Sequence, residues 1–308
     1  MVEEIDERPA RRFLHVCYCC DDKSATTTML TGGLGLRHAW TSPTGHQSAA
    51  ILGLGDVVSG ADFVFDGRGP RTSPAIEVQE WREPEVVGAP YDDPTAVGVH
   101  ALGFAVPDVG AAVRDLTAAG SKVVSSDARL LGSGSTTLRD ANGVTIDLVD
   151  DPSIPAGECR MRHLRITVSD LAASVRWYEC LGFDVVDEVT VEGGALLGLD
   201  GDVRADAARL RLPDEPYEAL LVQWRTPTSH GRHYVEPNHA GLYRAALGVD
   251  DTRAAHAALA AAGVAFDLEP VSVELTGTPV PDMWICFLSD PDGIPYELVE
   301  RPRSSFRP

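Results

Sequence analysis

The sequence lacks several features that would place it in a common functional class. No apolar run approaches the roughly 20 residues that a membrane helix requires, so we expect no membrane partner. Lys and Arg number 26 against 46 Asp and Glu, which gives a formal net charge of −20. Phosphate binding requires clustered basic residues, so we expect no nucleic-acid partner. The charged start of the chain has no apolar segment typical of a secretory signal, and we therefore expect a cytoplasmic protein.

Three familiar active-site signatures are also missing. The chain has no Gly-rich dinucleotide-binding turn, no P-loop and no Gly-x-Ser-x-Gly turn. Its six cysteines are expected to be reduced thiols, because the chain is long and shows no export signal. The segment Cys17-Tyr-Cys19-Cys20 has no second cysteine pair at zinc-finger spacing, so we interpret it as buried strand cysteines.

What the sequence does contain is a repeat. The segment DANGVTIDLV at 140–149 matches DPDGIPYELV at 290–299, each position 150 residues apart. An alternating, β-branched strand followed by an aspartate and a helical stretch begins near residues 15, 101, 163 and 244. The pattern predicts an α+β fold of four β-α-β-β-β units. We expect two domains, residues 13–150 and 158–302, joined by a linker rich in proline and acidic residues.

Two segments of the second half carry a family resemblance. The stretches HLRITVSDLAASVRWYECLGF (163–183) and FLSDPDGIPYELVER (287–301) resemble the vicinal-oxygen-chelate superfamily, which contains glyoxalases, bleomycin resistance proteins and extradiol dioxygenases. The resemblance extends over about residues 13–301. It implies two tandem glyoxalase-like domains whose mixed sheets curl around clefts. It also implies a divalent metal in a cleft, held by positions on the first and last strands of each unit.

The resemblance assigns metal positions residue by residue. In the first half they are His15, Glu77, Ala101 and Asp147, and in the second half His163, Leu221, Arg244 and Glu297. The ligand-capable residues are His15, Glu77, Asp147, His163 and Glu297. Imidazole and carboxylate ligands suit Fe²⁺, Mn²⁺, Zn²⁺ or Ni²⁺. The units either pair within each half or pair across the halves, in which case His15 would join Glu297 and His163 would join Asp147.

Other polar residues are candidates for substrate binding. Arg165, Arg244 and Gln223 lie at strand positions that the alternation places on the cleft face, and His239 lies in a loop before Arg244. Arginine cannot ligate a metal, so Arg244 would bind a substrate anion or pair with Glu297. His100 is one residue out of phase with Ala101, which predicts that its side chain points to the opposite face.

These observations leave two classes of function open. The first is a metal-dependent enzyme acting on a small oxygenated molecule, with Glu77, Glu297 or His163 as catalytic acid or base. Glyoxalase-like lyase or isomerase chemistry is preferred over ring-cleaving dioxygenation, because arginine replaces a second histidine at 244. The alternative is a metal-free protein that binds an antibiotic or aromatic molecule. We expect a small-molecule partner, with a homodimer as the candidate assembly.

Overall fold

The fold is seen in a computed structural model that describes residues 8–126, 129–131, 134–213, 215–274 and 282–301. Each of the four units has one α-helix and four strands. The first contains β1 (Ala10–Cys20), α1 (Lys23–Leu34), β2 (Arg37–Ser48), the 3-10 turn η1 (Ala50–Leu52), β3 (Asp56–Phe65) and β4 (Ala75–Glu83). The second contains β5 (Gly98–Val106), α2 (Val109–Ala118), β6 (Lys122–Ser125), β7 (Thr136–Arg139) and β8 (Thr145–Asp150).

The second half repeats this order. The third unit contains β9 (Arg160–Thr167), α3 (Leu171–Leu181), β10 (Asp184–Glu192), β11 (Arg204–Arg211) and β12 (Glu218–Thr226). The fourth contains β13 (Gly241–Val249), α4 (Thr252–Ala261), β14 (Phe266–Glu274), β15 (Asp282–Ser289) and β16 (Pro295–Glu300). The predicted α+β class and its four units are therefore confirmed. Over the described ranges, no helix has the length and apolar character needed to cross a membrane.

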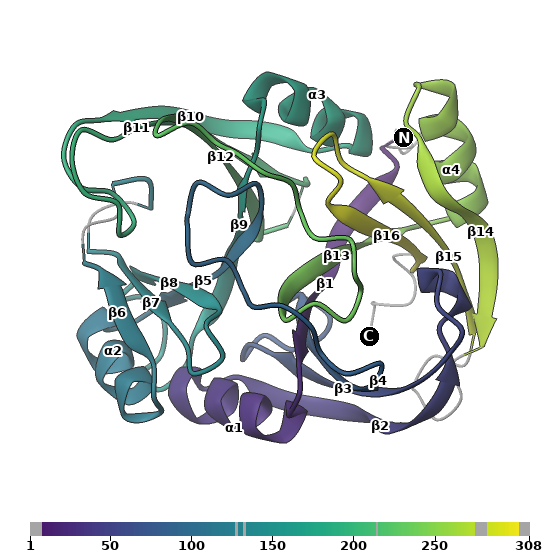
Figure 1. The fold of residues 1–308 in the computed structure, drawn as a ribbon, viewed down its shortest axis with the longest axis horizontal. Coiled ribbons are helices and arrows are strands. Elements are labelled where there is room, and N and C mark those ends of the chain that lie inside the picture. Colours follow the sequence, from purple (N-terminus) through teal and green to yellow (C-terminus); the bar gives the residue numbers. More distant parts are fainter. Residues whose placement is uncertain (1–7, 127–128, 132–133, 214, 275–281, 302–308) are drawn as a thin grey trace, which may run out of the picture.

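The units pair across the two halves of the sequence. One eight-stranded sheet, which we call sheet I, has the order β14-β15-β16-β13-β1-β4-β3-β2 and joins the first unit to the fourth. The other, sheet II, has the order β10-β11-β12-β9-β5-β8-β7-β6 and joins the second unit to the third. Figure 1 shows the helices at the periphery, with α3 and α4 above the sheets and α1 and α2 below them in this view. The sequence left two pairings of the units open, and the structure has the pairing across the halves. The domain boundaries 13–150 and 158–302 stay a prediction.

The helices begin where the sequence predicted. Asp22, Asp108, Asp170 and Asp251 each precede a helix in extended backbone conformation, and each side chain accepts a hydrogen bond from the amide three residues later. Such a bond satisfies one of the amide groups that a helix leaves unpaired at its start. The Thr-rich helix α1 forms although its apolar pattern is weak, and its threonine hydroxyls bond back to carbonyls one turn earlier.

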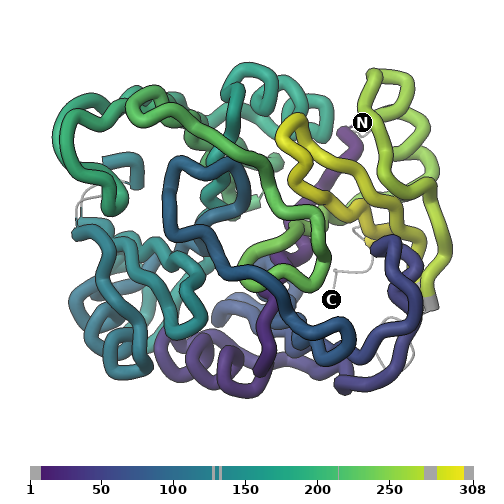
Figure 2. Tube along the Cα trace, viewed as in Figure 1, coloured from purple at the N-terminus to yellow at the C-terminus, as the bar shows by residue number. Residues whose placement is uncertain are grey.

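Two connecting segments link the sheets. Residues 84–97 lead from β4 to β5, and residues 227–240 lead from β12 to β13. They contact each other through bridges between Val87 and His239 and between Ala96 and His230. In Figure 2 they run side by side near the middle of the view. At the centre of each sheet two antiparallel strands from different units are paired, β1 with β13 in sheet I and β5 with β9 in sheet II.

Candidate functional site

Four polar side chains meet on the central strands of sheet I. We call His15, Glu77, Arg244 and Glu297 the sheet I cluster; they lie on β1, β4, β13 and β16. His15 Nε2 lies 3.4 Å from Glu77 Oε2 and 3.5 Å from Glu297 Oε2. Arg244 Nη2 donates to Glu77 Oε2 at 2.9 Å, and Arg244 Nε lies 3.7 Å from Glu297 Oε2. One imidazole, two carboxylates and one guanidinium are thus in mutual contact.

A small residue between the strands allows His15 to meet Glu297. Ala246 on β13 is paired with His15 on one side and with Glu297 on the other. Paired residues of neighbouring strands share a face, so a large side chain at Ala246 would stand between the imidazole and the carboxylate. Ala246 therefore acts as a spacer between the two side chains.

A break in strand register directs Arg244 into the cluster. Val16 is paired with Ala245 and Tyr18 with Leu242, so Cys17 alone lies opposite both Tyr243 and Arg244. This two-against-one arrangement is a β-bulge, which redirects side chains relative to a regular strand. Arg244 Nη1 lies 3.5 Å from Cys17 Sγ, and Tyr243 packs with Cys17, Cys19 and Trp81 in a buried apolar group. Alternation in the sequence assigned Arg244 to this face but not Tyr243. The bulge interrupts the two-residue alternation of side chains, so the sequence does not show that Tyr243 lies beside Cys17.

The charges of the sheet I cluster stabilise one another. Burial alone would raise the pKa of Glu297, but its interactions with His15 and Arg244 outweigh burial and lower this pKa. Burial would lower the pKa of Arg244, but the neighbouring Cys17 thiol and the two carboxylates raise it well above its ordinary value. Both groups are therefore ionised at neutral pH. Two nitrogen atoms, His15 Nε2 and Arg244 Nε, are buried and have no hydrogen-bond partner among the residues that the structure describes.

A second polar group lies in sheet II. We call Asp147, His163 and Arg165 the sheet II cluster. Arg165 donates to both Asp147 oxygens, at 2.7 and 3.2 Å, His163 Nε2 lies 3.3 Å from Asp147 Oδ2, and Thr137 donates to Asp147 Oδ1 at 2.8 Å. Burial would raise the pKa of Asp147, but Arg165 and His163 hold it far below its ordinary range. Burial lowers the pKa of His163, which keeps this imidazole neutral at pH 7.

The sheet II cluster is closed to solvent. The side chains of Asp147, His163 and Arg165 are 0–2% exposed, whereas that of His15 in sheet I is 15% exposed. Gly103 is paired with both Asp147 and His163, and a Cβ atom there would lie 2.2 Å from the His163 ring. The adjacent cavity measures only about 10 Å³, room for at most one water molecule. His163 and Arg165, predicted as catalytic and substrate-binding residues, are therefore packed away from any substrate.

Three further sequence expectations change in the structure. Gln223 was a candidate for substrate binding, but its amide accepts from Leu171 N and donates to Ser169 O, which fixes it at the start of α3. His239 stacks on Tyr234, with ring centroids 3.8 Å apart, and binds the Ala240 carbonyl rather than Arg244. His100 lines the same small cavity as Arg165 instead of the opposite face, because it is an extra residue between the pairs Val99–Ile166 and Ala101–Arg165.

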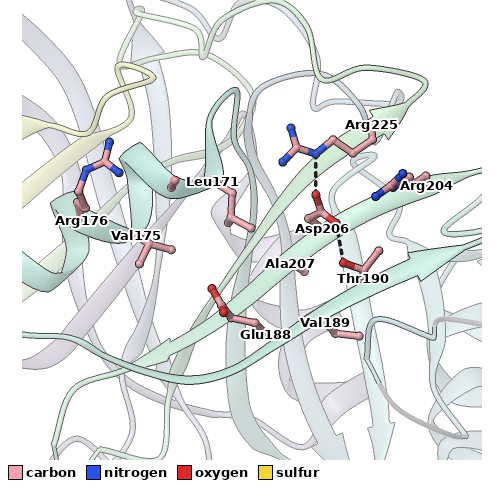
Figure 3. A pocket seen from close by; sticks show the side chains of 11 residues that line it. Leu171, Val175, Arg176, Glu188, Val189, Thr190, Arg204, Asp206, Ala207 and Arg225 are labelled. Atoms are coloured by element: carbon pink, nitrogen blue, oxygen red, sulfur yellow. Dashed lines mark hydrogen bonds and ion pairs between the residues drawn. The ribbon is translucent and has the colours of Figure 1, made fainter.

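A larger groove of about 690 Å³ lies beside α3, away from both clusters. Figure 3 shows Asp206 in this groove, where its carboxylate accepts hydrogen bonds from Thr190 and Arg225. Arg204, which also lines the groove, forms an ion pair with Glu192. The groove lies apart from the positions to which the resemblance assigns a metal, and its Asp206 is already bonded to Thr190 and Arg225.

Comparisons with known proteins bear on the fold. Residues 160–298 match the family model of the glyoxalase/bleomycin resistance protein/dioxygenase superfamily. Glyoxalase I from Zea mays is similar to the whole chain in structure, with 18% identity, a TM-score of 0.70, and coverage of 96% of this chain and 94% of that one. A suspected dioxygenase from Bacillus subtilis has 11% identity, a TM-score of 0.56, and coverage of 95% and 86%. No curated protein matches the sequence.

The superfamily resemblance stated from the sequence is thereby confirmed, and with it the vicinal-oxygen-chelate fold of the chain. Because the similar structures have low sequence identity, they establish the fold of the whole chain and not its reaction. The positions at which the resemblance predicts a metal are divided between the sheets: His15, Glu77, Arg244 and Glu297 lie in sheet I, and Ala101, Asp147, His163 and Leu221 lie in sheet II.

The residues present do not fit a divalent metal in either sheet. In sheet I, one of the four positions holds a guanidinium, which has no lone pair to donate. The fixed positive charge of Arg244 would repel a divalent ion, and it already neutralises part of the charge of the two carboxylates. Among the described residues, no three His, Cys, Asp or Glu side chains are arranged to hold a metal ion.

Proposed function

We propose that this protein is a glyoxalase-like enzyme of lyase or isomerase type, whose sheet I cluster transfers protons on a small oxygenated organic molecule. The convergence of His15, Glu77, Arg244 and Glu297 within 3.7 Å carries this proposal, because it combines a base, a second carboxylate and a fixed cation in one place. The similarity in fold to glyoxalase I supports a small-molecule reaction. The sheet II cluster would stabilise the fold.

The proposed reaction begins with proton removal by a carboxylate. Glu297 is ionised and lies next to His15 and Arg244, so it would take a proton from a carbon atom adjacent to a substrate carbonyl. The electron pair of the broken C–H bond would move to the carbonyl oxygen and form an enolate. In a substrate with a hydroxyl on that carbon, the proton would return to the former carbonyl carbon while the hydroxyl proton passes to the enolate oxygen. The new carbonyl then lies on the carbon that lost its hydrogen, which gives an isomer of the substrate.

Two unpartnered nitrogens would receive the oxygen on which charge develops. His15 Nε2 and Arg244 Nε are buried and lack hydrogen-bond partners in the described part of the chain. Both face Glu297 Oε2, at 3.5 and 3.7 Å. A substrate oxygen between them would be stabilised by the guanidinium charge, as preorganised donors stabilise oxyanions in other enzymes. Glu77 would hold Arg244 in place through its 2.9 Å hydrogen bond.

Deuterium exchange tests this proposal without knowledge of the final product. The purified protein would be incubated in D₂O, with chelator present, with small 2-oxo and 2-hydroxy carbonyl compounds, and exchange beside the carbonyl would be followed by NMR. We expect at least one compound to exchange, and Glu297→Gln to slow that exchange by about 10²-fold or more.

A variant outside the sheet I cluster provides the control. Gln223→Ala alters a residue that lies at α3 and outside the sheet I cluster, so its exchange rate should equal that of the wild type. Equal rates for folded Glu297→Gln and wild type would exclude Glu297 as the base. Loss of exchange in Gln223→Ala, with the protein still folded, would place the chemistry elsewhere.

A metal-free binding protein is the second candidate. Apolar groups flank the sheet I cluster: one contains Cys17, Trp81 and Tyr243, and another contains Ile285 and Phe287. Aromatic and aliphatic side chains of this kind suit an aromatic ligand. Calorimetry separates the two functions: a compound that binds but does not exchange, with the same affinity for wild type and Glu297→Gln, would favour binding alone.

A further inference from the structure

We infer that the Arg244 guanidinium is a built-in replacement for the divalent cation that the four sheet I positions would otherwise surround. The inference concerns the site of the proposed function, but it is tested through metal content and not through turnover. Its first support is position. Arg244 occupies the superfamily metal position on β13, and its hydrogen bond to Glu77 uses the carboxylate oxygen that lies 3.4 Å from His15.

The second support is charge. The sheet I cluster contains two carboxylates, which are only 10–11% exposed, and Arg244 contacts both of them. Buried carboxylates require a counter-charge, and a fixed guanidinium supplies it without any bound ion. The bulge opposite Cys17 places the guanidinium between the two glutamates, because it turns Arg244 toward them from the central strand β13.

The third support is independent and comes from sheet II. There Arg165 makes a two-point contact with Asp147, and His163 lies 3.3 Å from the same carboxylate. Arg165 lies on β9, two residues after the metal position at His163, whereas Arg244 lies at a metal position itself. Both sheets therefore combine histidine, carboxylate and arginine, although the arginine lies at a different strand position in each. This is the result expected if an arginine replaces a cation in both sheets.

If the guanidinium is the obstacle to metal binding, one substitution should remove it. Arg244→His would place a second imidazole beside His15, Glu77 and Glu297. Two imidazoles and two carboxylates are a donor set that zinc and cobalt accept. His15 Nε2 already lies 3.4 Å from Glu77 Oε2 and 3.5 Å from Glu297 Oε2, so the new imidazole would join three donors that are close together.

The experiment measures metal uptake by the full chain. Wild type, Arg244→His and the double variant Arg244→His with His15→Ala would be stripped with chelator, dialysed against Co²⁺ or Zn²⁺, desalted and analysed for bound metal. Arg114→His, which adds a histidine on the exposed face of α2, controls for surface binding. We expect about one equivalent in Arg244→His, a visible cobalt absorption band and a metal-dependent rise in Tm. Wild type and Arg114→His should show none of these, and the double variant should bind the metal more weakly than Arg244→His because it has lost one of the four donors.

Three results would overturn the inference. The first is stoichiometric metal in wild type purified without chelator, lost in Glu297→Gln. The second is a rise in wild-type Tm on adding Zn²⁺ that Glu297→Gln abolishes. The third is a folded Arg244→His protein that takes up no metal. The first two need only wild type and Glu297→Gln, so they decide the question even if Arg244→His does not fold. None of them depends on enzymatic activity, so failure of the proposed reaction leaves this test intact.

Discussion

Replacement of Asp147 by asparagine should strongly destabilise the protein. Asp147 is fully buried and forms a two-point ion pair with Arg165, whose side chain is 2% exposed. Asparagine keeps the shape and can still accept one hydrogen bond, but it removes the negative charge. Removing one partner of a buried ion pair costs about 3–5 kcal/mol, because the other charge is left uncompensated. We therefore expect Asp147→Asn to lower the free energy of unfolding by about this amount.

An aspartate-to-asparagine substitution in an exposed ion pair is the control for this loss of stability. Asp187 also pairs with an arginine, Arg209, at 2.8 Å, but its side chain is 51% exposed. Solvent screens such pairs, which contribute about 0–1 kcal/mol, so Asp187→Asn should have little effect. Urea unfolding followed by circular dichroism would give both values, with the slope checked for two-state behaviour.

The outcome also bears on the role of sheet II. If Asp147→Asn and Asp187→Asn have equal, small effects, the sheet II cluster does not stabilise the fold and the argument from its burial is wrong. If Asp147→Asn is strongly destabilised but the folded fraction keeps its full deuterium-exchange rate, the separation of a structural sheet II from a reactive sheet I is supported.

Three other changes test particular features of the fold. Gly103→Ala should lower the free energy of unfolding by about 1–3 kcal/mol in thermal or urea unfolding, because its Cβ would overlap the His163 ring. Gly45→Ala, whose Cβ meets no atom within 4 Å, should be neutral. Equal effects of the two substitutions would contradict the packing argument. Burial raises the pKa of Asp290 to about 7, so ionisation of this group lowers the stability of the fold increasingly as pH rises from about 4 to 7. Asp290→Asn should therefore stabilise the protein by about 2 kcal/mol more at pH 8 than at pH 5. A stability difference that does not vary with pH would show that Asp290 titrates normally. Asp170→Ala should cost about 1 kcal/mol through loss of the α3 cap, and no loss of stability would refute the capping role.

Local features of the fold were predictable from the sequence because they depend on neighbouring residues. Asp170 caps α3 through an amide three residues away, and Asp290 closes its turn by accepting from Asp292 N and Ile294 N. Such contacts require only short-range spacing, which the sequence displays directly. The repeat of these local signals was enough to predict four units.

The pairing of the units was not predictable, because it depends on contacts between distant strands. His15 and Ala246 are neighbours in sheet I although 231 residues separate them, and nothing in either segment excludes the other arrangement. The site residues show the same limit. The resemblance assigned His15, Glu77, Arg244 and Glu297 to metal positions, but the sequence could not show that the sheet I cluster keeps some solvent exposure while the sheet II cluster has almost none.

Shifts in strand register explain the remaining errors. His100 was assigned to the wrong face because one extra residue interrupts the pairing of β5 with β9. Tyr243 was overlooked because the bulge opposite Cys17 brings two consecutive residues to one face. A bulge inserts a single residue, so the period of two that identifies a strand does not reveal it.

The nested order of the units has a consequence for synthesis of the chain. Sheet II is built from residues 98–226, a continuous stretch, whereas sheet I needs both the first and the last quarter of the chain. A ribosome delivers the N-terminal strands long before their partners, so β1 has one edge without its β13 neighbour until translation is nearly complete. The inner pair of units would close first and the outer pair last. Premature termination near residue 240 would leave the inner sheet whole while depriving His15 and Glu77 of Arg244 and Glu297.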